Sequence, residues 1–219
     1  MSLPALVAPG RRPLAVRRPW IGAFLVVLER IACALALLAL SPLLLAIAFA
    51  VRVDSSGPVL FRQLRVGQYG RTFRILKFRT MRVGADAELQ QLLEDRASEM
   101  TAYVKITDDP RITRLGRFLR ATSLDELPQL ANVVAGHMSL VGPRPQTPHE
   151  SELYGVTDWR RLLVRPGITG LWQVSGRSDL SPTESLELDA TYVRDWTPMM
   201  DLRLLLRTVK VVLTRRGAV

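Results

Sequence analysis

A long uncharged stretch near the N-terminus dominates the pattern of hydrophobic and polar positions. The chain from Ile31 to Val51 reads IACALALLALSPLLLAIAFAV, 21 residues without a charged side chain. An α-helix rises about 1.5 Å per residue, so this stretch would extend roughly 31 Å, about the thickness of the hydrocarbon core of a bilayer. The pattern therefore predicts a membrane segment.

The pair Ser41-Pro42 interrupts the middle of this stretch. Proline has no N–H to donate and clashes with the preceding turn, so a helix must bend there, while a serine hydroxyl can bond to a freed carbonyl. Basic residues flank the stretch on both sides, and such residues concentrate on the cytoplasmic side of membrane segments. The flanking residues are Arg11, Arg12, Arg17, Arg18, Arg52, Arg62 and Arg65. We therefore expect both ends to be cytoplasmic and residues 21–52 to form a re-entrant membrane helix hairpin broken at Ser41-Pro42.

Two other interpretations of the apolar stretch remain open. A proline-kinked helix can span a bilayer when neighbouring groups satisfy the freed carbonyls. A cleaved signal peptide is the second, because Ala48-Phe49-Ala50 resembles a cleavage site. The stretch is, however, longer than the apolar core of a typical signal peptide and starts late in the chain. The sequence favours a membrane segment that stays in the protein.

The remaining pattern predicts an α+β domain that is mostly helical. Two β-prone runs, 59–66 and 72–80, surround the turn signal Gly67-Gln68-Tyr69-Gly70 and predict a β-hairpin. An acidic helix is expected over 85–100. Asp109 and Pro110 are typical of a helix cap and of the first helical position, so a helix is expected to start there. Its basic face would carry Arg111, Arg114, Arg117 and Arg120.

The last helical pattern, over 202–216, is amphipathic. Its predicted basic face holds Arg203, Arg207, Lys210 and Thr214, and its predicted apolar face holds Leu202, Leu205, Leu206, Val209, Val212 and Leu213. Such a helix lies in a membrane interface or packs its apolar face on a domain core, and the upstream membrane stretch favours the interface. The chain thus divides into a basic tail over 1–20, the membrane helix over 21–52 and a domain over 53–219.

Composition and charge exclude several chemistries. The 219 residues are 48% hydrophobic and carry a net charge of +10. The single cysteine, Cys33, excludes a disulfide framework and a Cys-rich zinc site, and together with only two histidines it argues against Cys/His nucleophilic catalysis. Of the 30 basic residues 27 are arginine, which suits bidentate contacts with phosphate, although an arginine-rich genome would give the same bias.

The most informative polar group is the acid pair Asp125-Glu126. It lies between Arg120 and the rigid turn Gly142-Pro143-Arg144-Pro145. An ordinary capping box formed by Ser123 and Glu126 is the structural alternative. Pro128 weakens that alternative, because it would be the fifth residue of the capped helix and cannot donate a hydrogen bond. P-loop, dinucleotide-fold and nucleophile-elbow motifs do not occur in the sequence, so the acid pair is the main candidate for catalysis.

A second candidate segment runs from Arg165 to Ser178, RPGITGLWQVSGRS. The pattern predicts a Pro-Gly turn, a short apolar strand that contains Trp172, and a Gly-Arg turn. Trp172 could stack on a planar base and Arg177 could hold a phosphate. The alternative is that Trp172 belongs to the core.

Three blocks of the chain resemble the bacterial sugar transferase family, the monotopic polyprenyl-phosphate phosphoglycosyl transferases. These blocks are LFRQLRVGQYGRTFRILKFRTM, DDPRITRLGRFLRATSLDELPQLANVVAGHMSLVGPRP and RPGITGLWQVSGRS. The resemblance runs from Ser41-Pro42 to the C-terminal helix, and is to the short family form. It implies a cytoplasmic catalytic domain over 53–219 at the bacterial inner membrane. It also implies transfer of a hexose 1-phosphate, with glucose or galactose favoured, from a UDP-sugar to undecaprenyl phosphate.

The resemblance also implies roles for single residues. Asp125 would attack the β-phosphorus, UMP would leave, and a phosphosugar-aspartyl intermediate would form. Glu126, with Asp125, would hold Mg²⁺, while Arg120, Arg144 and Lys77 match family residues near phosphate. The product would be the first membrane intermediate of an exopolysaccharide or O-antigen-type glycan.

The charge also fits a different class of protein. A non-enzymatic protein that binds a membrane surface or nucleic acid would carry a similar basic excess. The resemblance favours the enzyme, for which membrane lipid is an expected partner, nucleic acid is not, and an oligomer is possible.

Overall fold

The computed structural model describes residues 19–85, 109–152, 156–176 and 180–214. Most of the predicted basic tail, most of the predicted acidic helix and Arg177 lie outside these residues. The described part is mostly helical, with two small two-stranded sheets, so the predicted α+β class is confirmed.

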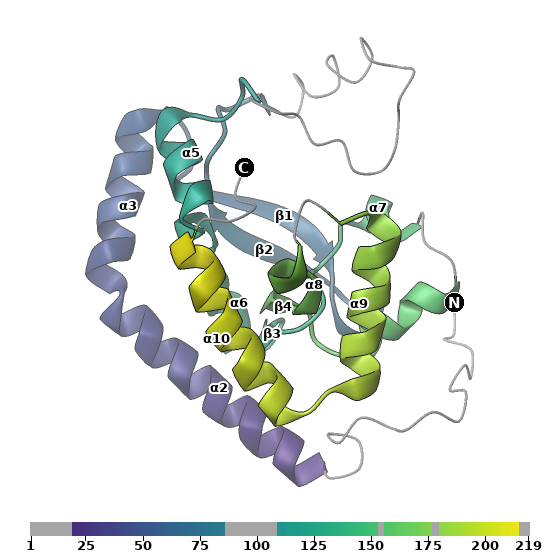
Figure 1. Cartoon of the computed structure of the whole chain (residues 1–219). Coiled ribbons are helices and arrows are strands. Elements are labelled where there is room, and N and C mark those ends of the chain that lie inside the picture. Colours follow the sequence, from purple (N-terminus) through teal and green to yellow (C-terminus); the bar gives the residue numbers. More distant parts are fainter. Residues whose placement is uncertain (1–18, 86–108, 153–155, 177–179, 215–219) are drawn as a thin grey trace, which may run out of the picture.

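Two helices, α2 (Pro19–Ala39) and α3 (Ser41–Asp54), form the apolar N-terminal segment. They meet at Leu40 in an open bend, which places them end to end along one side of the molecule (Figure 1). The bend follows from Pro42 at the start of α3, and the Ser41 hydroxyl donates a 2.7 Å hydrogen bond to the carbonyl of Leu38. The helix is thus interrupted next to Ser41-Pro42 as predicted, while the re-entrant hairpin in a membrane stays a prediction. By length and composition, Gly22–Ala39 could cross a bilayer, and it is the one such stretch among the described residues.

The α2–α3 segment buries one side and exposes the other. Cys33 packs against Phe73, and Ile47 and Val51 pack with Phe78, in two buried clusters beneath the segment. Ten large apolar side chains of the same helices are exposed: Phe24, Val27, Leu28, Ile31, Leu35, Leu38, Leu43, Leu45, Phe49 and Val53. An apolar surface of this extent is unfavourable in water, so the outer side of the segment fits contact with an apolar phase.

The predicted β-hairpin is confirmed. Strands β1 (Leu60–Val66) and β2 (Thr72–Phe78) pair antiparallel, with Leu60 opposite Phe78 and Val66 opposite Thr72. The short 3₁₀ helix η1 (Gln68–Gly70) joins them. Gly70 adopts a φ of 76°, a left-handed conformation that glycine adopts without steric cost.

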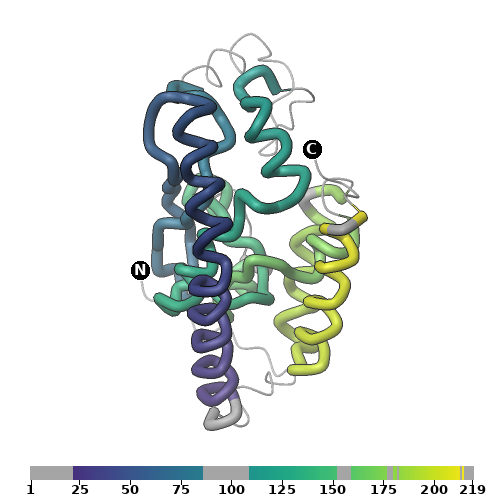
Figure 2. Tube along the Cα trace, turned by 90° about the vertical axis from the view of Figure 1, so that its left-hand side faces the viewer, coloured from purple at the N-terminus to yellow at the C-terminus, as the bar shows by residue number. Residues whose placement is uncertain are grey.

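Short elements and two longer helices complete the domain (Figures 1 and 2). After the hairpin come α5 (Arg114–Ala121), η2 (Leu124–Glu126), α6 (Gln129–Val134) and strand β3 (Ser139–Val141). Then follow α7 (Pro148–Glu152), η3 (Val156–Leu163), strand β4 (Gly167–Thr169), α8 (Leu171–Ser175), α9 (Pro182–Asp195) and α10 (Pro198–Thr214). Strands β3 and β4 pair in parallel.

The expected helix start at Asp109 is wrong. Helix α5 begins at Arg114, where the Thr113 side chain accepts a 2.9 Å hydrogen bond from the N–H of Gly116. Asp109 instead accepts hydrogen bonds from the backbone N–H and the guanidinium of Arg111. The side chain that was expected to cap a helix therefore closes a local turn with a buried ion pair.

The strand expected around Trp172 is also wrong, because this residue lies in α8. Strand β4 ends at Thr169, and the Gly170 carbonyl then accepts the N–H of Val174, which starts a helical turn. A five-residue helix is too short for helical periodicity to distinguish it from a strand.

The C-terminal helix α10 packs on the domain but leaves much apolar surface exposed. Leu204 is buried with Val141, Tyr192 and Val193, a contact that the predicted apolar face did not include. Leu202, Leu206 and Val209 of the predicted apolar face are exposed. One side of α10 therefore belongs to the core, while these three side chains remain available for an apolar surface.

Candidate active site

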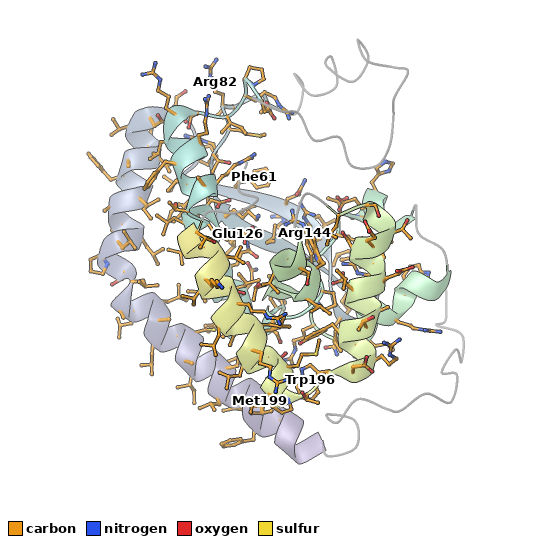
Figure 3. All side chains as sticks on the ribbon, viewed as in Figure 1. Phe61, Arg82, Glu126, Arg144, Trp196 and Met199 are labelled. Atoms are coloured by element: carbon orange, nitrogen blue, oxygen red, sulfur yellow. The ribbon has the colours of Figure 1, made fainter. Side chains whose placement is uncertain are left out.

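The acid pair lies where helix α5, strand β2 and the short helix η2 meet. Asp125 and Glu126 are in η2, Arg120 is in the last turn of α5, and Lys77 is on β2. Figure 3 shows Glu126 close to the C-terminal end of α5. The fold thus brings together residues that are up to 49 positions apart in the sequence.

Ser123 turns the chain between α5 and the acid pair. Its φ of 55° and ψ of 18° are left-handed, which costs a non-glycine residue of order 1–2 kcal/mol. Its side chain does not form a capping bond, and the Glu126 carboxylate pairs instead with the Lys77 ammonium at 2.5 Å. The capping-box alternative is therefore wrong.

Asp125 is a buried carboxyl group with a perturbed pKa. Its exposed fraction is 7%. Burial raises the pKa of Asp125 from its ordinary value of 3.8 to about 6; Lys77 and Arg120 oppose this rise, and Glu126 adds to it. The charges around Asp125 thus compensate only part of the cost of burying its ionised form, a condition typical of functional sites.

Arg120 is held beside the acid pair by Thr80. Its Nε donates a 2.9 Å hydrogen bond to the buried Thr80 hydroxyl. Burial lowers the pKa of Arg120, while the charges of Asp125 and Asp109 raise it. A side chain at Gly116 would collide with the Thr80 backbone, so α5 approaches this segment closely only because Gly116 has none. Sequence reasoning missed Thr80 and Gly116, although Thr80 follows Lys77 within the motif KFRTM.

Arg144 lies on a separate loop, where its charge acts on Asp189 and is not among the charges that shift the pKa of Asp125. This loop, Gly142 to Pro145, follows β3 and is bonded to β4, because Gly142 donates to the carbonyl of Thr169 at 2.8 Å. A second hydrogen bond between the loop and β4 runs from the N–H of Gly167 to the carbonyl of Pro143, at 2.9 Å. The Arg144 side chain is half-buried.

Trp172 lies in α8, which has no buried residue, and the start of this helix is close to the Arg144 loop. A side chain at Gly170, two residues before Trp172, would collide with the carbonyl of Gly142. Trp172 is half-buried, so part of its indole is accessible. Its predicted base-stacking role stays a prediction, as does the role of Arg177, which lies outside the described residues.

The adjacent carboxylates of Asp125 and Glu126 are the residues expected to hold magnesium. Among the described residues, no group of three or more Asp, Glu, His or Cys side chains could hold a metal. Mg²⁺ does not need one, since it usually binds one or two carboxylates together with substrate phosphates and water. Asp125 and Glu126 would supply the two carboxylates of such a site.

Comparison with known proteins places the chain in a family. The model for the family described as "Bacterial sugar transferase" matches residues 22–215. The chain is 49% identical over 170 residues to the galactosyl transferase CpsE of Streptococcus agalactiae, covering 77% of this chain and 37% of the relative. It is 43% identical over 187 residues to the exopolysaccharide production protein ExoY of Sinorhizobium fredii, covering 84% of this chain and 83% of that protein.

A third relative carries a more specific name. The chain is 42% identical over 202 residues to the UDP-glucose:undecaprenyl-phosphate glucose-1-phosphate transferase of Caulobacter vibrioides, covering 88% of this chain and 70% of the relative. The chain thus spans well under half of the streptococcal protein and most of the other two. The family match extends from α2 to beyond the described end of α10 and includes the whole acid-pair site. This chain therefore belongs to the bacterial sugar transferase family.

Proposed function

We propose that this protein transfers a sugar 1-phosphate from a UDP-sugar to undecaprenyl phosphate and releases UMP. The names of the relatives from Caulobacter vibrioides and Streptococcus agalactiae support glucose or galactose as the sugar. The observation that carries the proposal is the buried carboxyl group of Asp125 beside Glu126, Lys77 and Arg120. A carboxylate in this setting is suited to nucleophilic attack on an anionic phosphorus centre.

The proposed reaction has two displacement steps. An ionised Asp125 oxygen attacks the β-phosphorus of the UDP-sugar, and the bond from that phosphorus to the bridging oxygen breaks, so that UMP leaves. An oxygen of undecaprenyl phosphate then attacks the same phosphorus, and the bond to Asp125 breaks. Neither nucleophile carries a proton at neutral pH, so no general base is required. This fits a chain with only two histidines.

The positive side chains offset the repulsion between Asp125 and the diphosphate. Lys77 and Arg120 lie close enough to affect the pKa of Asp125, and we propose that Arg144 contacts a substrate phosphate from its loop. Asp125 and Glu126 would hold Mg²⁺, which supplies charge neutralisation at the diphosphate. Pre-positioned charges of this kind contribute strongly to phosphoryl transfer, because the protein does not have to reorganise during the reaction.

We propose that α2 and α3 enter the cytoplasmic leaflet of the bacterial inner membrane and return to the same side. Their exposed apolar side supports insertion. The end of α3 is tied to the domain by Arg79, whose guanidinium donates to the carbonyl of Ser55 at 2.6 Å and to its hydroxyl at 2.9 Å. In this arrangement the apolar side chains of α10 rest at the interface, where the phosphate of the lipid acceptor is located.

The proposed product is the first membrane-bound intermediate of an exopolysaccharide or O-antigen-type glycan. The name of the ExoY relative, an exopolysaccharide production protein, supports this assignment.

The test of the activity is UMP release by the full chain in nanodiscs. The protein is incubated with undecaprenyl phosphate, Mg²⁺ and either UDP-glucose or UDP-galactose, with Asp125→Asn as the matched control. We expect UMP and a sugar phospholipid from the wild type, and a covalent adduct of a hexose phosphate on the peptide that contains Asp125. Release of no UMP from any of a panel of UDP-sugars would reject the enzyme and favour a non-enzymatic basic protein that binds membrane or nucleic acid.

Topology has a separate test. Single cysteines introduced over residues 11–18 are labelled with a membrane-impermeant reagent in intact cells and in inverted vesicles. The native Cys33 is buried and contributes little background. Labelling from the cytoplasmic side at these positions and after α3 is expected; labelling of residues 11–18 only from the periplasm would reject the re-entrant arrangement.

A further inference from the structure

Three successive carbonyl groups, two in the Arg144 loop and one directly after it, are each held by a different donor. The carbonyl of Arg144 accepts a 2.6 Å hydrogen bond from Nη2 of Arg161. The carbonyl of Pro145 accepts from Nη1 of Arg65 at 3.0 Å, and the carbonyl of Gln146 accepts from the N–H of Val66 at 2.8 Å. The backbone around Arg144 is therefore fixed by strand β1 on one side and by η3 on the other.

Arg161 is itself held by a buried partner. Its Nη2 lies 2.7 Å from Oδ2 of Asp189 on α9, and the side chains are 7% and 2% exposed. Burying two charges is costly, and a buried ion pair is often no more stable than an apolar pair of the same volume. Core stability alone thus gives little reason to place an arginine and an aspartate here.

Hydrogen bonds hold the peptide planes on both sides of Arg144. Pro143 and Pro145 have fixed φ angles, and a residue that precedes proline is restricted to extended conformations. The freedom that remains is chiefly rotation about ψ of Pro143 and φ of Arg144, which sets the position from which the Arg144 side chain extends. The N–H of Gly167 holds the carbonyl of Pro143, and Arg161 holds the carbonyl of Arg144. Because both planes are held, this position is fixed.

The charges of Arg144, Arg161 and Asp189 sum to a positive excess. Burial raises the pKa of Asp189 to about 7, while the guanidinium groups of Arg161 and Arg144 lower it. Asp189 therefore lies close to both arginines. One carboxylate pairs directly with Arg161. Two positive charges against one negative charge leave the cluster with a positive excess on the loop.

We infer that Arg161, oriented by Asp189, is a positioning residue that holds Arg144 in place to bind a phosphate of the nucleotide sugar. The inference rests on the proposed function, since it takes Arg144 as a phosphate ligand. Arg161 does not touch substrate in this account. Its effect passes through the Arg144 carbonyl.

A double-mutant cycle on kcat/KM for the UDP-sugar tests this inference with the full chain in nanodiscs. Arg161→Lys keeps the charge but has one ammonium in place of a planar fork, so it cannot bond Asp189 and the Arg144 carbonyl with the same geometry. We expect it to lower kcat/KM about tenfold in the wild-type background and less than about twofold in the Arg144→Gln background. Asp189→Asn is measured in the same way and is expected to show the same dependence on Arg144.

The matched control is Arg111→Lys, which alters another buried ion pair, with Asp109 at 2.5 Å, in a side chain that also bonds the carbonyl of Ala85. Any loss of kcat/KM that it causes is expected to be the same in the wild-type and Arg144→Gln backgrounds, because it acts through stability or through Arg120 and not through Arg144. Equal effects of Arg161→Lys in both backgrounds would overturn the inference alone. Absence of UMP from the wild type would overturn the inference and the proposed function together. Circular dichroism confirms folding of each variant before the kinetic comparison.

Discussion

Replacing Asp125 by asparagine is expected to abolish the transferase reaction and to stabilise the fold. Both effects follow from removing the ionised carboxylate, because the nucleophile is lost and a charge that is costly to bury is lost with it. Burial raises the pKa of Asp125 above its ordinary value, so the folded chain binds a proton at this site more tightly than the unfolded chain does. The free energy of unfolding therefore decreases as pH rises from about 4 to above 6, because the ionised carboxylate is disfavoured in the folded state. Asparagine has nearly the same shape and carries no charge at any of these pH values.

The size of the gain follows from the pKa. A rise from 3.8 to about 6 corresponds to about 3 kcal/mol at a pH above both values. This is an upper limit, since the asparagine amide also has to find hydrogen-bond partners in the buried site. We expect about 1 to 3 kcal/mol at pH 7.5, and about half of that gain at pH 5. For a chain of this size the gain at pH 7.5 raises Tm by several degrees, on the order of 2–4 °C per kcal/mol.

Thermal unfolding in detergent, with EDTA present, measures this effect. EDTA is needed because Mg²⁺ bound to the ionised wild type would stabilise that protein alone. Asp109→Asn is the matched control, because Arg111 lowers the pKa of Asp109 and the charge there stabilises the fold. We expect this control to lower stability by about 3 kcal/mol. A lower Tm for Asp125→Asn at pH 7.5, or a gain that does not change between pH 5 and 7.5, would refute the reasoning from burial.

Three further outcomes are expected. The acidic limb of the pH profile of kcat/KM should lie near pH 6, where Asp125 becomes ionised. Because Lys77 lowers the pKa of Asp125, Lys77→Met should move this limb to higher pH, and a limb that does not move would argue against Asp125 as the titrating group. Gly116→Ala should lower the free energy of unfolding by about 1–3 kcal/mol, because the new methyl group meets the Thr80 backbone. Alanine normally stabilises a helix relative to glycine, so an increase in the free energy of unfolding, measured with denaturant, would contradict this prediction. Glu29→Ala should lower the free energy of unfolding by about 1–3 kcal/mol, because the N–H of Leu140 loses the acceptor that now lies 2.6 Å away. Glu29→Gln keeps an acceptor and should lower it less, and equal losses for the two variants would show that this hydrogen bond is not the cause.

Sequence reasoning succeeded where a local physical rule acts alone. Pro42 bends or interrupts a helix that would continue through it, and the β-prone runs around residues 67–70 fold into a hairpin because turn residues separate them. It failed where one side chain had several possible partners. Asp109 is chemically suited to a helix cap, but Arg111 two positions later binds it more strongly, and the helix starts at Arg114.

The acid pair shows the same contrast between what neighbouring residues determine and what the tertiary structure determines. The sequence by itself determined that Asp125 and Glu126 are adjacent, and that a long apolar segment and many arginines accompany them. Only the tertiary structure decided that Glu126 pairs with Lys77 and that Asp125 is buried with a raised pKa. The reason is that pKa values depend on desolvation and on charges within a few ångströms, and these distances join residues that lie far apart in the chain.

The Arg144 loop extends this point beyond the acid pair. Its two prolines and its arginine are visible in the sequence, and they predict a rigid turn. The partners that fix its carbonyls, Arg161 and Arg65, lie 17 and 80 residues from the groups they bind. A rigid turn is thus a local property of the chain. The direction in which it presents Arg144 is set by packing, because a backbone carbonyl takes whichever donor the fold brings to it.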